Sequence, residues 1–310
     1  MQQQIRGSVE MTAAMAISGT IGWFVLISKQ PVLDVVFWRC AFGALTLLLI
    51  CAALGLLRGH LNRRVLTLAA LGGAAIVINW LLLFASYSRA SISIATAVYN
   101  TQPFMLVALG ALLFREKVTT TKIAWLALAF VGMLLIVQSS HAGSSGSNYF
   151  AGIAMALAAA FFYALAAIAA KKLTGTPPHL IALIQVCVGV VMLIPFAQFS
   201  SLPSSTSTWA TLVTLGVVHT GLMYILLYGA IQKLPTHLTG SLSFIYPIVA
   251  IFVDYVAFGH RLHATQVVGA AAILIAAAGT NLGWKLPRYW TTSRAEERRT
   301  ADRAHECATH

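Results

Sequence analysis

Ten apolar runs, each about as long as a bilayer is thick, divide this chain of 310 residues. A helix needs about 20 residues to cross the hydrocarbon core of a membrane, so each run is long enough to span it. Short polar or proline-containing segments separate the runs, as expected of turns. The pattern predicts an all-α polytopic membrane protein with ten transmembrane helices, near residues 9–28, 31–57, 65–88, 91–114, 120–139, 149–172, 177–199, 209–232, 235–259 and 264–284.

Composition excludes most other classes of protein. Apolar residues make up 59% of the chain and charged residues only 9%, which is too little charge to cover a soluble protein of this length. The net charge of +12 does not indicate a nucleic-acid partner, because the basic residues lie in short clusters between apolar runs. The four cysteines lack metal-binding spacing, and no catalytic or nucleotide-binding motif is found. We therefore expect no enzyme, no metal and no cofactor.

The basic residues also predict how the chain is oriented. Most of the 20 lysines and arginines fall on one side if the N-terminus is cytoplasmic, and the other side holds only Lys29, Arg89 and Arg261. Because cytoplasmic loops are enriched in lysine and arginine, both termini are expected in the cytoplasm. The chain then divides into a first five-helix repeat (1–140), a loop (141–148), a second five-helix repeat (149–284) and a cytoplasmic tail (285–310).

Five spans per half mean that the second half enters the membrane upside down. A shift of 144 positions places Pro103 on Pro247 and Trp80 on Tyr224 without a gap. Inverted repeats are common in secondary transporters, whose substrate site lies near the midplane between the halves. The sequence thus favours a small-molecule transporter in a lipid bilayer.

The two prolines suggest where such a site would form. Pro103 and Pro247 each lie inside a long apolar run, where proline frees a backbone carbonyl that protein or a water-filled cavity must satisfy. Polar residues precede or flank each of these two prolines. We interpret the prolines as pivots beside a cavity, while a packing kink remains the alternative.

Other polar and aromatic groups within the spans are candidates for the cavity wall. Each could equally form an interhelical hydrogen bond of about 1 kcal/mol. The predicted cavity residues are Asn79, Trp80, Tyr99, Asn100, Gln102, Tyr163, His219, Tyr224, Ser243 and Tyr246.

Few charged groups could couple transport to an ion. Arg39 lies inside the second span and either faces protein and water or reaches the outer headgroups. Glu10 and Asp254 are the remaining coupling candidates, although Asp254 has no evident partner in the sequence. Glu116 is expected to pair with a neighbouring cation, namely Arg115, Lys117 or Lys122. Facilitated transport and minimal antiport both remain open.

The chain resembles the EamA repeat of the drug/metabolite transporter superfamily. The resemblance covers residues 7–284 and rests on Arg39, on Pro103 followed thirteen residues later by Glu116, and on Gly132 sixteen residues beyond. The second half departs from the family pattern, with Gln185 at the counterpart of Arg39 and His260 where glutamate is usual. Within the superfamily the chain is most similar to the bacterial YddG-type exporters of aromatic amino acids.

This resemblance implies an inner-membrane protein that exports amino acids or related metabolites by alternating access. It also implies a central cavity between the first, third, fourth, sixth, eighth and ninth helices. Efflux of drugs or quaternary cations is the alternative function, and a membrane-embedded assembly or sensor protein is a third. The sequence does not decide the oligomeric state, and we take a monomer as the working expectation.

Overall fold

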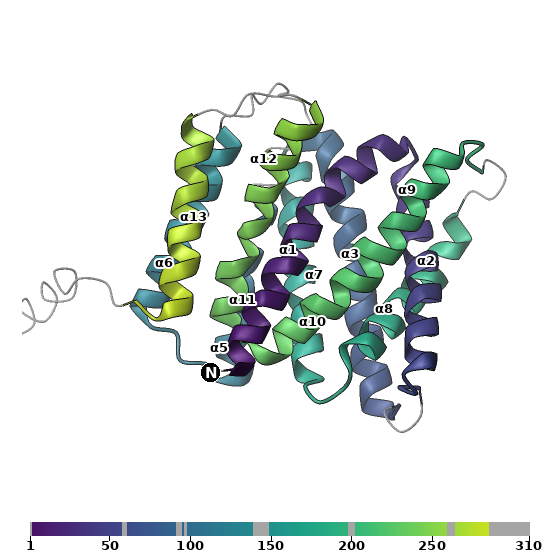
Figure 1. Ribbon diagram of the computed structural model, residues 1–310, viewed down its shortest axis with the longest axis horizontal. Coiled ribbons are helices and arrows are strands. Elements are labelled where there is room, and N and C mark those ends of the chain that lie inside the picture. The colour runs from purple at the N-terminus through teal and green to yellow at the C-terminus, as the bar shows by residue number, and fades with distance from the viewer. Residues whose placement is uncertain are drawn as a thin grey trace, which may run out of the picture.

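The protein is a bundle of helices in the computed structural model, which describes residues 2–57, 61–90, 95, 98–138, 149–197, 202–258 and 264–284 (Figure 1). All the regular elements in these residues are helical. In chain order they are α1 (Gln2–Ser28), α2 (Val32–Ala53), α3 (Arg63–Ala90), α5 (Gln102–Phe114), α6 (Thr120–Gln138), α7 (Tyr149–Lys172), α8 (Pro178–Leu193), η1 (Ile194–Phe196), α9 (Thr206–Gly216), η2 (Val217–Leu222), α10 (Met223–Lys233), α11 (Thr236–Ser243), α12 (Ile245–Phe258) and α13 (Ala264–Leu282).

Six helical stretches of the described chain are long and apolar enough to cross a membrane. They are Val32–Ala53, Arg63–Ser86, Tyr149–Lys172, Pro178–Phe196, Thr206–Lys233 and Thr236–Ala257. Three shorter apolar helices accompany them, at Gln102–Phe114, Thr120–Leu135 and Val267–Thr280. The all-helical, membrane-spanning fold class is confirmed, whereas the count of ten spans and the side on which the termini lie stay predictions.

Some helix ends differ from the ends of the predicted spans. The first helix begins at Gln2 rather than at residue 9, and α2 ends at Ala53 rather than at residue 57. Polar residues at a helix end are compatible with helix once the chain has left the hydrocarbon, so hydropathy alone places such ends poorly. Part of the predicted fourth span, residues 91–94, 96 and 97, lies outside the described residues, as does the tail from residue 285.

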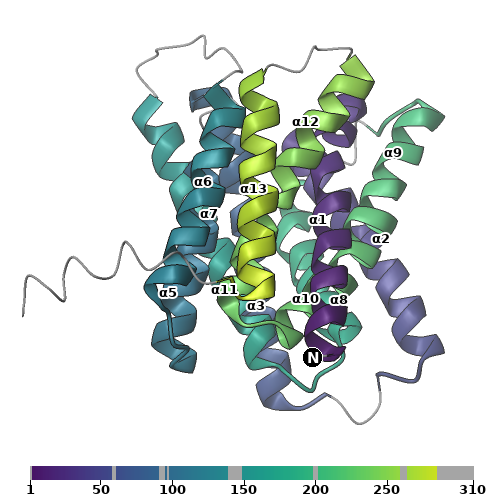
Figure 2. The ribbon, with the colours of Figure 1, turned by 60° about the vertical axis from the view of Figure 1, so that its left-hand side comes forward.

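Helices of the two predicted halves interlock rather than forming separate bundles. In the first half, α1 packs against α10 and α12, and α2 packs against α8 and α9. In the second half, α7 packs along α3 and α5, which is the reciprocal arrangement. Helices α6 and α13 pack against each other at one side of the molecule (Figures 1 and 2). Helix α1 begins, and α13 ends, at the same end of the bundle, which we call the N-terminal end (Figure 1).

Small residues make these close helix contacts possible. An added Cβ at Gly132 on α6 would lie 2.6 Å from the backbone oxygen of Gly269 on α13. One at Gly73 on α3 would lie 2.8 Å from the Cα of Gln185 on α8. Lipid is as apolar as the side chains, so membrane helices associate through such close backbone packing more than through hydrophobic burial.

Three irregularities interrupt the helices. A turn at Asn100 and Thr101 precedes α5, so Pro103 lies in the first turn of that helix, where its missing N–H is tolerated. Phe244 separates α11 from α12 in the same way, just before Pro247. A π-helical segment, η2, joins α9 to α10. The two prolines therefore follow breaks between helices rather than lying within continuous helices.

Candidate functional site

An aromatic cluster occupies the interior of the bundle, where helices from both halves meet. Trp80 on α3 lies edge-on to Tyr224 on α10, with ring centroids 5.9 Å apart, and Tyr224 contacts Tyr228 at 5.2 Å. Tyr99 contacts Tyr163 on α7 at 6.3 Å. We define the aromatic cluster as Trp80, Tyr99, Tyr163, Tyr224 and Tyr228. It brings together four of the predicted cavity residues, and Trp80 and Tyr224, which the internal shift equates, touch each other.

Arg39 lies beside this cluster and is almost completely buried, with 2% of its surface exposed. Its guanidinium carbon lies 4.3 Å from the ring centroid of Trp80. Arg39 Nε donates to Thr220 Oγ1 at 2.7 Å and Nη2 donates to the backbone oxygen of His219 at 2.9 Å. The described residues contain three ion pairs, and none of them involves Arg39. The side chain therefore points into the protein rather than reaching the outer headgroups.

The π-helical segment η2 supplies both partners of Arg39. A π-turn inserts an extra residue and shifts the backbone, and such turns often occur at functional sites. The His219 side chain contacts α1, where its Nε2 lies 2.7 Å from Thr20 Oγ1 and its ring packs against Phe24. His219 is thus buried near the cluster but does not belong to it.

Two predicted cavity residues carry polar atoms without a partner. Asn79 Nδ2 donates to the backbone oxygen of Ala159 at 2.7 Å and lies 3.3 Å from the Tyr99 hydroxyl, but its Oδ1 has no hydrogen bond within the protein. Gln102 Oε1 also lacks a partner. Buried polar atoms are nearly always bonded, so these two acceptors indicate places where a ligand could bind.

The remaining predicted residues divide between packing and the cluster edge. Ser243 donates to the backbone oxygen of Thr239 within its own helix. Tyr246 is only partly buried and lies close enough to Tyr99 for their phenols to interact electrostatically. Asn100 is buried at the break before α5. Asp254 belongs to α12, but its side chain lies outside the described residues.

Ion pairs tie helices together at the N-terminal end of the bundle. Glu10 on α1 accepts from Lys233 on α10 at 2.5 Å and from Arg6 at 3.0 Å. We call the contact between Glu10 and Lys233 the α1–α10 latch. Each of the two carboxylate oxygens of Glu10 accepts a hydrogen bond from a cation, so in the present conformation Glu10 links α1 to α10.

Glu116 forms a second contact of the same kind. Its Oε2 accepts from Thr236 N at 2.9 Å and from Thr236 Oγ1 at 2.6 Å, and its Oε1 lies 3.1 Å from Lys171 Nζ. We call this arrangement the α5–α11 latch. Burial raises the pKa of the Glu116 carboxyl, but the bonds from Thr236 and the charge of Lys171 outweigh it, so the pKa lies below its usual value.

The expected pairing of Glu116 with a neighbouring cation was therefore wrong. Residue Arg115 adopts a left-handed conformation, with φ of 54°, at the end of α5. The chain leaves the helix axis at this turn. Glu116 then contacts Lys171 and Thr236, which are more than 50 residues distant in sequence. Within the described residues, no three His, Cys, Asp or Glu side chains are grouped so that they could hold a metal.

Comparison with known proteins assigns the family. The model of the EamA-like transporter family matches residues 7–138 and again residues 150–282. The chain belongs to the EamA-like transporter family. The predicted resemblance is thereby confirmed at the level of the family, and the protein is a membrane transporter. The aromatic amino-acid specificity of the YddG type is not thereby established.

Relatives of this EamA-like transporter include proteins from bacteria and archaea. It is 31% identical to the uncharacterised transporter YxxF of Bacillus subtilis, covering 90% of both chains. It is 28% identical to an uncharacterised transporter of Archaeoglobus fulgidus, covering 90% of this chain and 96% of the relative. A protein of Salmonella typhimurium named "Probable amino-acid metabolite efflux pump" is 27% identical over 58% of this chain and 64% of its own length.

A solved crystal structure shares the fold of this EamA-like transporter. It superposes with a TM-score of 0.77 at 18% identity, covering 89% of this chain and 96% of that structure's chain. At this identity the likeness concerns the fold alone. The relatives are transporters rather than enzymes, in keeping with the absence of enzyme motifs from the sequence.

Sequence reasoning about this EamA-like transporter missed two interior contacts. Gln185 on α8 accepts a hydrogen bond from the buried Tyr228 hydroxyl, and Thr220 accepts from Arg39. A signal for the first was present, because Gln185 occupies the position of Arg39 in the second half. In both halves this position holds a polar side chain that bonds to the segment η2–α10.

Proposed function

We propose that this transporter exports amino acids, aromatic ones among them, and related carboxylate-bearing metabolites across the bacterial inner membrane by alternating access. One observation carries the proposal: a buried guanidinium beside an aromatic cluster, with no carboxylate partner among the described residues. A protein named for amino-acid metabolite efflux among the relatives gives independent support.

The electrostatics of Arg39 favour an anionic group on the cargo. Removing a charged side chain from water costs several kcal/mol, and neutral oxygens compensate for it only in part. The partners of Arg39 are a hydroxyl and a backbone carbonyl, both neutral. A substrate carboxylate would complete the pairing, and guanidinium binds carboxylate through paired hydrogen bonds.

The same charge argues against the alternative of drug or quaternary-cation efflux. A cation brought to the aromatic cluster would face the Arg39 charge across the Trp80 ring, 4.3 Å from the guanidinium carbon. Like charges at short range repel strongly in a medium of low dielectric constant. The aromatic rings are better suited to the apolar or aromatic side chain of an amino acid.

The unpartnered Oδ1 of Asn79 could accept a hydrogen bond from the ammonium group of an amino acid. Asn79 Oδ1 is buried without a hydrogen bond, and an ammonium group has three donors to offer. In this arrangement the carboxylate binds Arg39, the ammonium binds Asn79, and the side chain packs on the rings. The other residues proposed for the cavity are Asn100, Gln102, Tyr163 and Tyr246.

Alternating access would rest on the latches and the helix breaks. If the N-terminal end faces the cytoplasm, the two latches hold that end closed in the present conformation. The helix breaks before Pro103 and Pro247 lie at positions equivalent under the internal shift, and broken helices at the substrate site are common in secondary transporters. Export then requires the latches to open while the halves rock about the two breaks.

The proposal is tested in liposomes that contain the purified protein and no imposed ion gradient. Efflux of labelled phenylalanine is compared with efflux of phenylalaninamide, which keeps the ring and the ammonium group but lacks the carboxylate. We expect flux of phenylalanine only, and Arg39→Gln should reduce it strongly, while Arg39→Lys retains part. Equal flux of the amide, or normal flux through a folded Arg39→Gln protein, would refute carboxylate recognition.

Coupling to an ion is tested separately. The carboxylate of Glu10 is engaged by two cations, which favours facilitated movement down a gradient over a proton relay through this residue. Asp254 remains a candidate for proton coupling. If it couples protons, Asp254→Asn should abolish the pH dependence of flux, and an unchanged dependence would exclude it.

A further inference from the structure

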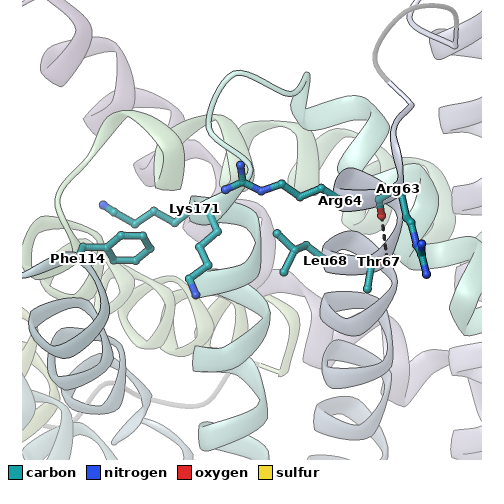
Figure 3. A pocket seen from close by; sticks show the side chains of 7 residues that line it. Arg63, Arg64, Thr67, Leu68, Phe114 and Lys171 are labelled. Carbon is teal, nitrogen blue, oxygen red and sulfur yellow. Dashed lines mark hydrogen bonds between the residues drawn. The ribbon is translucent and has the colours of Figure 1, made fainter.

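A basic pocket opens at the N-terminal end of the bundle, away from the aromatic cluster. It has a volume of about 900 Å³ and lies between the start of α3 and the ends of α5 and α7. Arg63, Arg64, Lys171 and Lys172 line it, and Figure 3 shows Arg64 reaching across it toward Lys171. None of its lining residues is acidic.

Three of these cations are available to a ligand. Lys171 is already committed to Glu116 and to the backbone oxygen of Leu234. The side chains of Arg63, Arg64 and Lys172 are exposed and form no ion pair within the described residues. Among the described residues, the pocket therefore presents a local excess of positive charge, to which an external anion could bind.

An apolar groove lies beside this pocket on α3. It has a volume of about 390 Å³ and is lined only by apolar side chains and Cys187, from the chain after α2, from α3 and from α8. Its contacts on α8 extend from Leu180 to Met192, which is about 18 Å of helix. On α3 the groove residues Leu66 and Ala70 come within about two helical turns after Arg63 and Arg64, so the groove begins close to the basic residues.

The two hollows occupy neighbouring faces of the same helix. Arg64 and Leu68 line the pocket, whereas Leu66 and Ala70 line the groove. At about 100° per residue, Leu66 and Ala70 lie on average about 110° around α3 from the four pocket residues of that helix, at positions 63, 64, 67 and 68, which is nearly a third of a turn. A molecule with an anionic head and an apolar tail could therefore occupy both.

We propose that the start of α3 is a binding site for an anionic phospholipid, with the phosphate on Arg63, Arg64 and Lys172 and one acyl chain along the groove between α3 and α8. Basic pockets between transmembrane helices on the cytoplasmic side bind anionic lipid headgroups in general. The adjoining groove favours a lipid over free phosphate, because free phosphate has no apolar part that could occupy an apolar groove. The site is separate from the proposed amino-acid pathway and does not depend on it.

The test measures lipid retention by the full-length protein in detergent, using native mass spectrometry. Phosphatidylglycerol and phosphatidylcholine with identical acyl chains are titrated separately, and inorganic phosphate is added as a competitor. We expect phosphatidylglycerol to be retained preferentially and inorganic phosphate to leave it bound. Equal retention of the two lipids would overturn the proposal. Displacement by equimolar phosphate would assign the site to free phosphate instead.

Charge variants locate the headgroup. The double variant Arg63→Gln/Arg64→Gln should retain phosphatidylglycerol roughly 30-fold less well, since each cation near an anionic lipid contributes about fivefold. Arg63→Lys/Arg64→Lys should retain it as the wild type does, which shows that loss of charge rather than of fold is responsible. Lys117→Gln/Lys122→Gln removes the same charge outside the pocket. An equal effect from this control would refute the location.

Groove variants locate the tail. Val191 lines the groove and is 72% exposed, so Val191→Trp should fill the channel and lower phosphatidylglycerol retention. Leu112 on α5 is 76% exposed and lies outside the groove, so Leu112→Trp should have no effect. Unchanged retention in Val191→Trp would remove the acyl-chain part of the proposal.

Discussion

Replacing Thr236 by valine removes one hydroxyl from the α5–α11 latch and keeps the shape of the side chain. Thr236 is buried and donates both its backbone N–H and its Oγ1 to Glu116 Oε2. Hydrogen bonds to charged groups contribute about 1.5–3 kcal/mol. The Glu116 side chain is 18% exposed, and its bond from the Thr236 backbone N–H remains in the variant. We therefore expect the free energy of unfolding to fall by an amount near the lower end of this range, about 1–2 kcal/mol.

The assay is thermal unfolding of purified protein in detergent at a fixed heating rate. A loss of this size should lower the apparent melting temperature by about 2–5 °C. Thr239→Val is the matched control, because Thr239 lies one turn further along α11, is equally buried, and bonds only to the backbone oxygen of Pro235. An equal shift in both variants would show that the Glu116 contact adds nothing specific.

The pH dependence provides a second, independent check. The folded pKa of Glu116 is lowered, so the carboxylate stabilises the fold above its usual pKa of about 4.3, and this stability is lost as the pH falls through the folded pKa. Thr236→Val removes one cause of the lowering. The difference in melting temperature between wild type and variant should therefore be larger at pH 7 than at pH 4. A difference independent of pH would refute the role of the ionised carboxylate.

Three further predictions address other contacts. Gly132→Ala should destabilise the contact of α6 with α13 by about 1–3 kcal/mol, because the added Cβ would lie 2.6 Å from a backbone oxygen. Gly22→Ala is the control, since its Cβ meets open space, and it should be neutral or slightly stabilising in the same melting assay. Lys233→Met should lower the melting temperature by weakening the α1–α10 latch. Arg6→Gln should change the melting temperature little, because the Arg6 side chain is 75% exposed. Equal effects of the two variants would contradict the stabilising role of the contact between Glu10 and Lys233. Pro103→Ala should give a folded protein with slower efflux in the liposome assay, and an unaltered rate would remove the pivot role.

The membrane fold could be predicted from the sequence because hydropathy is a local property. A run of about 20 apolar residues must be helical in a bilayer, whatever surrounds it, since no water is present to satisfy the backbone. Helices α7 and α13 accordingly follow their predicted spans within one or two residues. The family could be predicted for a related reason, since Arg39, Pro103, Glu116 and Gly132 hold fixed spacings along the chain.

The composition of the candidate site was only partly predictable. The sequence singled out Trp80, Tyr99, Tyr163 and Tyr224 as aromatic groups within spans, and the structure brings them together. It could not show that His219 points toward α1 instead, because a π-turn rotates the residues around it. Such turns depend on the packing of neighbouring helices rather than on local composition.

The sequence by itself determined that the chain is a helical membrane protein, which family it belongs to, and which rare polar residues lie among its apolar ones. Only the tertiary structure decided their partners: Arg39 with Thr220, Glu116 with Lys171 and Thr236. The physical reason is that solvation by lipid or water acts on each residue separately. Hydrogen bonds and ion pairs, in contrast, need distances of about 3 Å between groups that only the folded chain brings together.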